Sequence, residues 1–200
     1  VHNGPDSHKE SAQEVVLMGD SAGGGLALAI ALRLHRLKST IESADSDSFA
    51  LPSDASFRSK LEQVQLPRLR LVTISAYTDL SCSTQSYKTR TWSDETMAGD
   101  PCFSSGDQAT DVKTSLEWAQ QYGCSQEKHP ECSPYYASAS ALASFPSTLM
   151  IVGDQELMLS ETTDLAKRAA DAGANVSLTV YPGMWHVFPM YTEACAKSPA

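Results

Sequence analysis

The chain has 200 residues, of which 42% are hydrophobic and 20% are charged, and its formal net charge is -9. This composition is typical of a folded globular protein and excludes an intrinsically disordered chain. The acidic balance argues against nucleic acid or an anionic membrane surface as a partner, and no apolar run is long enough to span a bilayer.

The first informative segment is a serine between two glycines. Residues Glu14 to Gly19 predict a buried parallel strand, and residues Ala22 to about Leu37 predict a helix that is apolar on nearly every face. Between them, Gly19-Asp20-Ser21-Ala22-Gly23 matches a nucleophile elbow, a tight strand-to-helix turn that exposes a serine hydroxyl. We expect Gly19 and Gly23 to flank the serine because side chains there would collide. A phosphate-binding or dinucleotide-binding loop is the alternative. A phosphate-binding P-loop needs Lys and then Ser or Thr after its last glycine, a dinucleotide-binding loop needs Gly-x-Gly-x-x-Gly, and neither pattern is present.

Beyond this helix the chain changes character twice. Residues 39–59 are rich in Ser and Asp and too polar to build a core, which predicts a flexible surface insertion. Residues 82–146 have mixed helix and loop character, with one helix near Thr114 to Tyr122. The remaining predicted elements are strands at Leu69–Ser75, Thr148–Gly153 and Val176–Tyr181, and a helix at Leu165–Ala172 that stops at Gly173. This alternation predicts an α/β fold with a mostly parallel sheet and helices on both faces.

The cysteines and histidines do not form a metal pattern. The five cysteines are Cys82, Cys102, Cys124, Cys132 and Cys195. An odd number leaves at least one thiol free or intermolecular and allows one surface disulfide. His129 lies between two of these cysteines, but the spacing matches no zinc site. We therefore expect no metal and no cofactor.

A reactive serine needs a histidine that takes its proton and an acid that orients the histidine. In the α/β-hydrolase fold these residues follow one another in the order serine, acid, histidine. His186 follows the last predicted strand through a Pro-Gly turn and is the predicted base, whereas the other histidines fall in poor positions, namely His2, His8, His35 and His129. Both Asp154 and Glu156 follow the third predicted strand, so both are candidates for the acid.

Four motifs together resemble those of the hormone-sensitive-lipase-like carboxylesterases of the α/β-hydrolase superfamily. They are the elbow Gly-Asp-Ser-Ala-Gly-Gly, Tyr77-Thr78-Asp79-Leu80-Ser81, Ser133-Pro134-Tyr135-Tyr136-Ala137 and Gly183-Met184-Trp185-His186. The resemblance runs from about Glu14 to the end of the chain. It implies a serine hydrolase that cleaves small-molecule carboxylic esters of short to medium acyl chain through an acyl-serine intermediate. The family spacing between acid and base favours Glu156 over Asp154.

The resemblance also implies a lid over the acyl pocket. About residues 82–146 would contribute to this lid or cap, with Trp92 and Trp118 in it. Packing in the core is the alternative for both tryptophans.

One expected part of the site is absent from the sequence. Members of the family bind the oxyanion with the N–H after the serine, here that of Ala22, and with an upstream His-Gly-Gly-Gly loop. The 200 residues contain no such loop and no strands before the elbow. We therefore expect residues 1–200 to be the C-terminal part of one α/β-hydrolase domain, a partial fold that lacks its N-terminal strands and has impaired activity.

Other functions remain open at this point. An amidase, deacetylase or lactonase would use the same three residues, and a ligand-binding protein or a truncated homologue would use none of them catalytically. The oligomeric state is open, and a cytoplasmic location is favoured over a secreted one.

Overall fold

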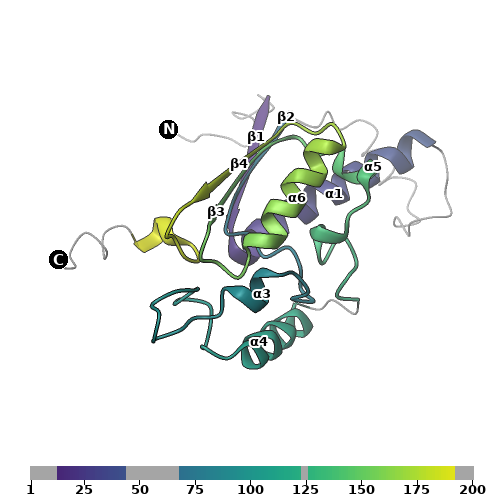
Figure 1. Ribbon diagram of the computed structural model, residues 1–200. Coiled ribbons are helices and arrows are strands. Elements are labelled where there is room, and N and C mark those ends of the chain that lie inside the picture. The colour runs from purple at the N-terminus through teal and green to yellow at the C-terminus, as the bar shows by residue number, and fades with distance from the viewer. Residues whose placement is uncertain (1–12, 44–67, 123–125, 192–200) are drawn as a thin grey trace, which may run out of the picture.

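The computed structural model describes residues 13–43, 68–122 and 126–191. These residues form a four-stranded parallel sheet with helices packed against it (Figure 1). The strands are β1 (Glu14–Asp20), β2 (Arg68–Ile74), β3 (Ser147–Gly153) and β4 (Val176–Tyr181). The helices are α1 (Ser21–Ser43), α3 (Ser86–Thr89), α4 (Gln108–Gln121), α5 (Ala139–Leu142) and α6 (Leu159–Asp171), with 3-10 turns η1 (Pro134–Tyr136) and η2 (Phe188–Tyr191).

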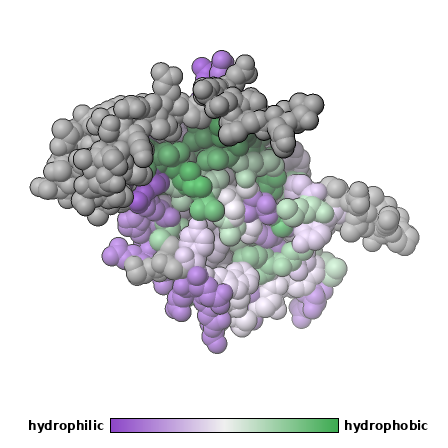
Figure 2. Space-filling view, turned by 180° about the vertical axis from the view of Figure 1, so that it is seen from behind, coloured by the Kyte–Doolittle hydropathy of each residue, from purple (hydrophilic) through white to green (hydrophobic). Residues whose placement is uncertain are grey.

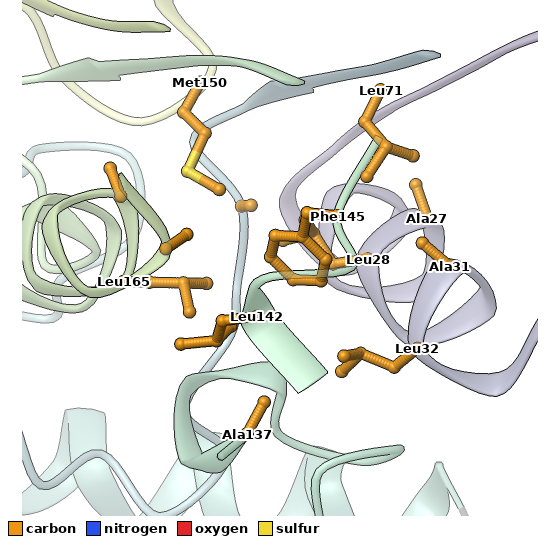
Figure 3. Close-up of a cluster of buried hydrophobic side chains, with 13 residues drawn as sticks. Ala27, Leu28, Ala31, Leu32, Leu71, Ala137, Leu142, Phe145, Met150 and Leu165 are labelled. Carbon is orange, nitrogen blue, oxygen red and sulfur yellow. The ribbon is translucent and has the colours of Figure 1, made fainter. Parts of the chain in front are cut away.

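The strand order explains where the helices lie. Neighbouring strands follow the chain order β1-β2-β3-β4, and every pair is parallel. Connections between parallel strands are right-handed, so a chain that always steps in one direction places its connecting helices on one face. Figure 3 shows α1 and α6 on the same side of the sheet. The predicted α/β class with a parallel sheet is confirmed, and within the described residues the helices that contact the sheet cover one of its faces.

The core lies between the sheet and these helices (Figure 3). Its centre includes five large side chains that are 1% exposed or less: Leu28, Leu71, Leu142, Met150 and Leu165. They come from α1, β2, α5, β3 and α6, so a single cluster joins residues far apart in the sequence. Burial of large aliphatic side chains contributes about 1.5–3 kcal/mol each to folding. This core fixes the carboxyl ends of β1 and β3 relative to each other.

The opposite side of the sheet is more open. Val16 and Met18 of β1 are 53% and 64% exposed. Among the described residues, β1 pairs with β2 alone and is an edge strand. Figure 2 shows an apolar area on the back of the molecule. An exposed apolar edge strand offers unpaired backbone groups to other chains and favours aggregation.

The predicted strands agree closely with the observed ones, whereas two helices begin earlier than predicted. The fourth strand has the predicted bounds, and the bounds of the first three differ by one residue at most at each end. α6 begins at Leu159 rather than Leu165. Its first turn is not evident from the sequence, because Glu161 and Thr162 are polar and yet buried. α4 begins at Gln108 rather than Thr114, since the carboxylate of Asp107 accepts a hydrogen bond from the N–H of Thr110 and caps the helix.

The predicted insertion at residues 39–59 is described only at its start. α1 continues to Ser43, so residues 39–43 are helical. The rest of the predicted insertion lies outside the described residues.

Candidate active site

At Ser21 the chain passes from strand β1 into helix α1 with no residue between them. β1 ends at Asp20 and α1 begins at Ser21, whose backbone φ is +50°. Residues other than glycine seldom adopt this left-handed conformation, which costs about 1–3 kcal/mol and is concentrated at functional sites. The backbone N–H of Tyr77 donates to the carbonyl of Ser21 at 2.9 Å and connects the turn to the segment that follows β2. This geometry is the one expected of a nucleophile elbow.

Close packing requires glycine at positions 19 and 25 but not at position 23. A Cβ on Gly19 would lie 2.3 Å from the carbonyl group of Gly23, and a Cβ on Gly25 would lie 2.2 Å from the carbonyl oxygen of Tyr77. A Cβ on Gly23 would meet nothing within 4 Å. The expectation that side chains would collide on both sides of the serine is therefore correct for Gly19 and wrong for Gly23, because the helix turns position 23 outward to solvent.

His186 reaches Ser21 from the loop after β4. Its Nε2 lies 3.0 Å from the Oγ of Ser21, and the residue is 5% exposed. The ring of Phe103 covers the imidazole with a centroid distance of 4.7 Å. A neutral imidazole with its proton on Nδ1 can accept the serine proton at Nε2 over this distance.

Glu156 is the carboxylate that the structure brings to the imidazole. Its Oε2 lies 3.4 Å from Nδ1 of His186, and the residue is fully buried. Its Oε1 accepts hydrogen bonds from the hydroxyl of Ser75 at 2.7 Å and from the N–H of Gly153 at 2.6 Å. One oxygen is thus held by two donors while the other faces the ring, an arrangement that can orient the imidazole.

Asp154, the other candidate acid, points to a different part of the loop. Its Oδ1 accepts from the N–H of Gly183 and from the side-chain amide of Gln155, both at 2.8 Å. These bonds fix the Pro-Gly turn that leads to the histidine. The geometry therefore favours Glu156 as the acid and gives Asp154 a supporting place in the turn.

Ser75 is a further residue of the candidate site, and no motif in the sequence indicated it. It follows β2, is fully buried and has a backbone φ of +51°. Its Oγ donates to Glu156 and accepts from the N–H of Val187 at 3.0 Å, so it joins the acid to the loop of the histidine. Its place after the carboxyl end of a parallel strand, where ligand and catalytic groups gather, was the available signal.

The predicted oxyanion donor lies at the start of α1. Ala22 is the second residue of this helix and is exposed. N–H groups in the first turn of a helix have no partner within the helix and carry partial positive charge. The N–H of Ala22 is therefore available to an oxyanion that forms beside Ser21.

An apolar cavity opens beside Ser21. Its volume is about 170 Å³, and it is lined by Ser21, Ala22, Gly25, Leu26, Tyr77, Leu80, Phe103, Trp118, Ala119, Tyr122 and Cys132. Phe103 packs edge-on against Trp118 and Tyr77, with centroid distances of 5.3 and 6.3 Å. Five lining residues come from the predicted lid segment 82–146, including Trp118. Trp92 is not among them, and its indole N–H donates to Asp94 at 2.7 Å.

The remaining candidate residues lie away from this cavity. His35 and His129 border a separate surface groove, and His2 and His8 lie outside the described residues. Among the residues that the structure describes, no group of three or more His, Cys, Asp or Glu side chains could hold a metal ion. Cys82 is a buried free thiol, Cys132 is disulfide-bonded, and Cys124 and Cys195 fall in undescribed segments. In the same described part of the chain, no helix combines the length and apolar character needed to cross a bilayer.

Comparison with known proteins identifies the architecture. A protein-family profile described as alpha/beta hydrolase fold matches residues 2–190. An esterase of Acinetobacter venetianus is 25% identical over 186 residues, which are 90% of this chain and 46% of the relative. An acetyl-hydrolase of Streptomyces hygroscopicus is 28% identical over 178 residues, which are 88% of this chain and 46% of the relative.

A solved structure agrees with these relatives. The crystal structure of an esterase from the bacterial hormone-sensitive lipase family superimposes with a TM-score of 0.60 and 26% identity, and the match covers 89% of this chain and 46% of that one. The chain thus spans about half the length of the proteins that it matches.

Proposed function

This chain belongs to the alpha/beta hydrolase fold family, as a hormone-sensitive-lipase-like member, and we propose that it hydrolyses carboxylic esters of short to medium acyl chain through an acyl-serine intermediate on Ser21. One observation carries this proposal. Ser21, His186 and Glu156 form a continuous series of contacts at 3.0 and 3.4 Å, although they are separated by 165 and 30 residues in the sequence. Relatives named esterase and acetyl-hydrolase support it.

The proposed reaction has two halves, formation and hydrolysis of the acyl-serine, and Ser21, His186 and Glu156 act in both. The Oγ of Ser21 attacks the ester carbonyl while its proton moves to Nε2 of His186, and the negative charge of Glu156 stabilises the imidazolium. The tetrahedral intermediate collapses, the bond to the alkoxy group breaks, and His186 returns the proton to the leaving alcohol. Water then attacks the acyl-serine with His186 as its base, and the acid product leaves.

The volume of the cavity beside Ser21 limits the size of the acyl group that it can hold. An engineered apolar cavity of about 150 Å³ in another protein holds a benzene molecule. The cavity here, at about 170 Å³, has room for a group of similar size. The lid formed in part by residues 82–146 would close this pocket with Phe103 and Trp118 as its walls.

The 200 residues would form the C-terminal part of one hydrolase domain with weakened turnover. They contain the N–H of Ala22 but no His-Gly-Gly-Gly loop to supply further oxyanion donors. Removal of one such donor costs a factor of about 10² to 10³ in kcat. Among the described residues β1 is an edge strand, with Met18 at 64% exposure, and such an edge favours aggregation.

Hydrolysis of p-nitrophenyl acetate and butyrate by the 200-residue chain tests this proposal, with Ser21→Ala as the control. We expect slow, Ser21-dependent release of p-nitrophenol, at a kcat about 10² to 10³ below that of the Acinetobacter venetianus esterase under the same conditions. Turnover equal to that relative would contradict the predicted impairment. Release that is unchanged by Ser21→Ala would contradict the catalytic role of the serine.

Two further assays separate the alternatives. A panel of esters, anilides and lactones distinguishes an esterase from an amidase or lactonase that uses the same residues. A fluorophosphonate probe that labels the wild type and not Ser21→Ala distinguishes an enzyme from a ligand-binding homologue. The 3.0 Å contact between His186 and Ser21 favours the enzyme.

A further inference from the structure

A second buried carboxylate lies close to the candidate active site and has no part in the proposed reaction. Asp100, in the segment between α3 and α4, is fully buried. Its Oδ1 accepts from the N–H groups of Cys102 and Phe103, both at 3.1 Å. Its Oδ2 accepts from the N–H of Leu157 at 3.4 Å. One carboxylate therefore joins a turn of the predicted lid segment to the loop that carries the acid.

The turn held by Asp100 carries the ring that covers the imidazole. The centroid of Phe103 lies 4.7 Å from that of His186 and 5.3 Å from that of Trp118. Because Asp100 fixes the backbone of Phe103, it also limits where this ring can lie. The wall of the cavity and the cover of the imidazole thus depend on the same hydrogen bonds.

The other contact of Asp100 reaches the neighbour of the acid. Leu157 follows Glu156 directly, and Gln155 precedes it. The side-chain oxygen of Gln155 accepts from the N–H of Gly99 at 3.3 Å, next to Asp100. The segment around Asp100 is therefore bonded to the acid loop on both sides of Glu156.

Burial raises the pKa of Asp100, and the positive charge of a protonated His186 opposes this shift. The ring of His186 itself is contacted by Ser21 from the start of α1 and by Glu156 from the loop after β3, and Phe103 covers it. Asp100 thus reaches the imidazole through the segments that it holds.

We propose that Asp100 is a positioning residue for the hydrolytic site, which holds the Phe103 ring and the Glu156 loop against His186. This inference rests on the proposed function, since it assigns Asp100 to the same site. A buried carboxylate used for packing alone would affect the stability of the protein but not the pH dependence of the reaction at Ser21.

The test compares Asp100→Asn with Asp107→Asn in the 200-residue chain. The amide oxygen at position 100 can still accept from Cys102 and Phe103, but the amide nitrogen meets the N–H of Leu157, donor against donor. Asp107 is a matched control, because it lies in the same segment, caps α4 at an exposed position and does not contact His186. Asparagine also caps helices well.

The readout is the second-order rate of labelling of Ser21 by a fluorophosphonate between pH 5 and 9. In this step the Oγ of Ser21 bonds to phosphorus, fluoride leaves, and the serine proton moves to His186. We expect Asp100→Asn to label about 10- to 100-fold more slowly. The midpoint of its pH profile should lie below that of the wild type, because the carboxylate of Glu156 is held less firmly against the imidazole. Asp107→Asn should match the wild type in both respects.

Each result decides between the proposals. A labelling rate and midpoint equal to those of Asp107→Asn would overturn the role of Asp100 while leaving the proposed function intact. Wild-type labelling that does not depend on Ser21 would instead overturn the proposed function. If Asp100→Asn does not fold by circular dichroism, Asp100→Ser keeps an oxygen for the local turn and is measured in its place. If neither variant folds, Asp100 serves folding alone and the inference is wrong.

Discussion

Glu156→Gln is the sharpest perturbation of the candidate site, because the structure determines how the glutamine must lie. Oε1 of Glu156 receives two hydrogen bonds, from Ser75 and from the N–H of Gly153. The amide oxygen takes this place, since both partners are donors. The amide nitrogen therefore faces Nδ1 of His186, which becomes an acceptor, and the ring proton moves to Nε2. An imidazole with its proton on Nε2 cannot accept the proton of Ser21.

The expected loss follows from the geometry of the pair. A unit negative charge at 3.4 Å from Nδ1 interacts with the imidazolium by about 5 kcal/mol at an effective dielectric constant of 20. A loss of 3 to 5 kcal/mol lowers a rate by about 10² to 10⁴. The corresponding amide substitution in the chymotrypsin-type triad lowers kcat by about 10⁴. We therefore expect a decrease of 10² to 10⁴ in the labelling rate of Ser21 and in the hydrolysis of p-nitrophenyl butyrate.

Asp154→Asn is the matched control for this variant. Asp154 lies two residues away, and its hydrogen bonds go to Gly183 and Gln155 rather than to the imidazole. Asp154→Asn should lower the labelling and hydrolysis rates less than about 10-fold, because the asparagine oxygen can still accept the hydrogen bonds of the turn. Equal and mild losses in the two variants would refute the assignment of Glu156, and a large loss in Asp154→Asn alone would reverse it.

Three further changes test the surroundings of the site. Ser75→Ala removes a donor from Glu156 and leaves a buried N–H without its acceptor, so Ser21 labelling should slow about 10-fold, and an unchanged rate would show that the acid is held by other contacts. Burial raises the pKa of Glu161 well above its usual range, so the folded state keeps a proton that the unfolded state releases, and stability falls as pH rises from about 4 through the folded-state pKa. Glu161→Gln should flatten this fall in urea unfolding between pH 4.5 and 8, and an unaltered slope would contradict it. Gly25→Ala places a Cβ 2.2 Å from a carbonyl oxygen and should cost about 1–3 kcal/mol in the same unfolding assay, whereas Gly23→Ala, in open space, should cost less than 1 kcal/mol.

The strands and the elbow could be predicted because their signals are local. A short valine-rich run before a glycine and an apolar run after it predict a strand and a helix wherever the rest of the chain lies. The first residues of α4 and α6 were harder to predict from the sequence. The cap at Asp107 is a local signal that the prediction did not use, whereas the burial of Glu161 becomes visible only once the loop after β2 packs against α6.

The choice between Glu156 and Asp154 as the acid also depends on contacts that form only in the folded chain. Both follow β3 by a few residues, and the sequence separated them only through family spacing. In the structure their side chains leave the loop in different directions, one toward His186 and one toward Gly183.

The sequence by itself predicted the tight turn at Ser21, the positions of the four strands and the histidine proposed as the base, because each depends on a short pattern of residue types. Tertiary structure alone decided that Glu156 faces the imidazole, that Ser75 supports it and that Phe103 covers it. These contacts join segments between 30 and 112 residues apart. Their existence depends on the packing of α1 and α6 against one face of the sheet, which no local pattern specifies.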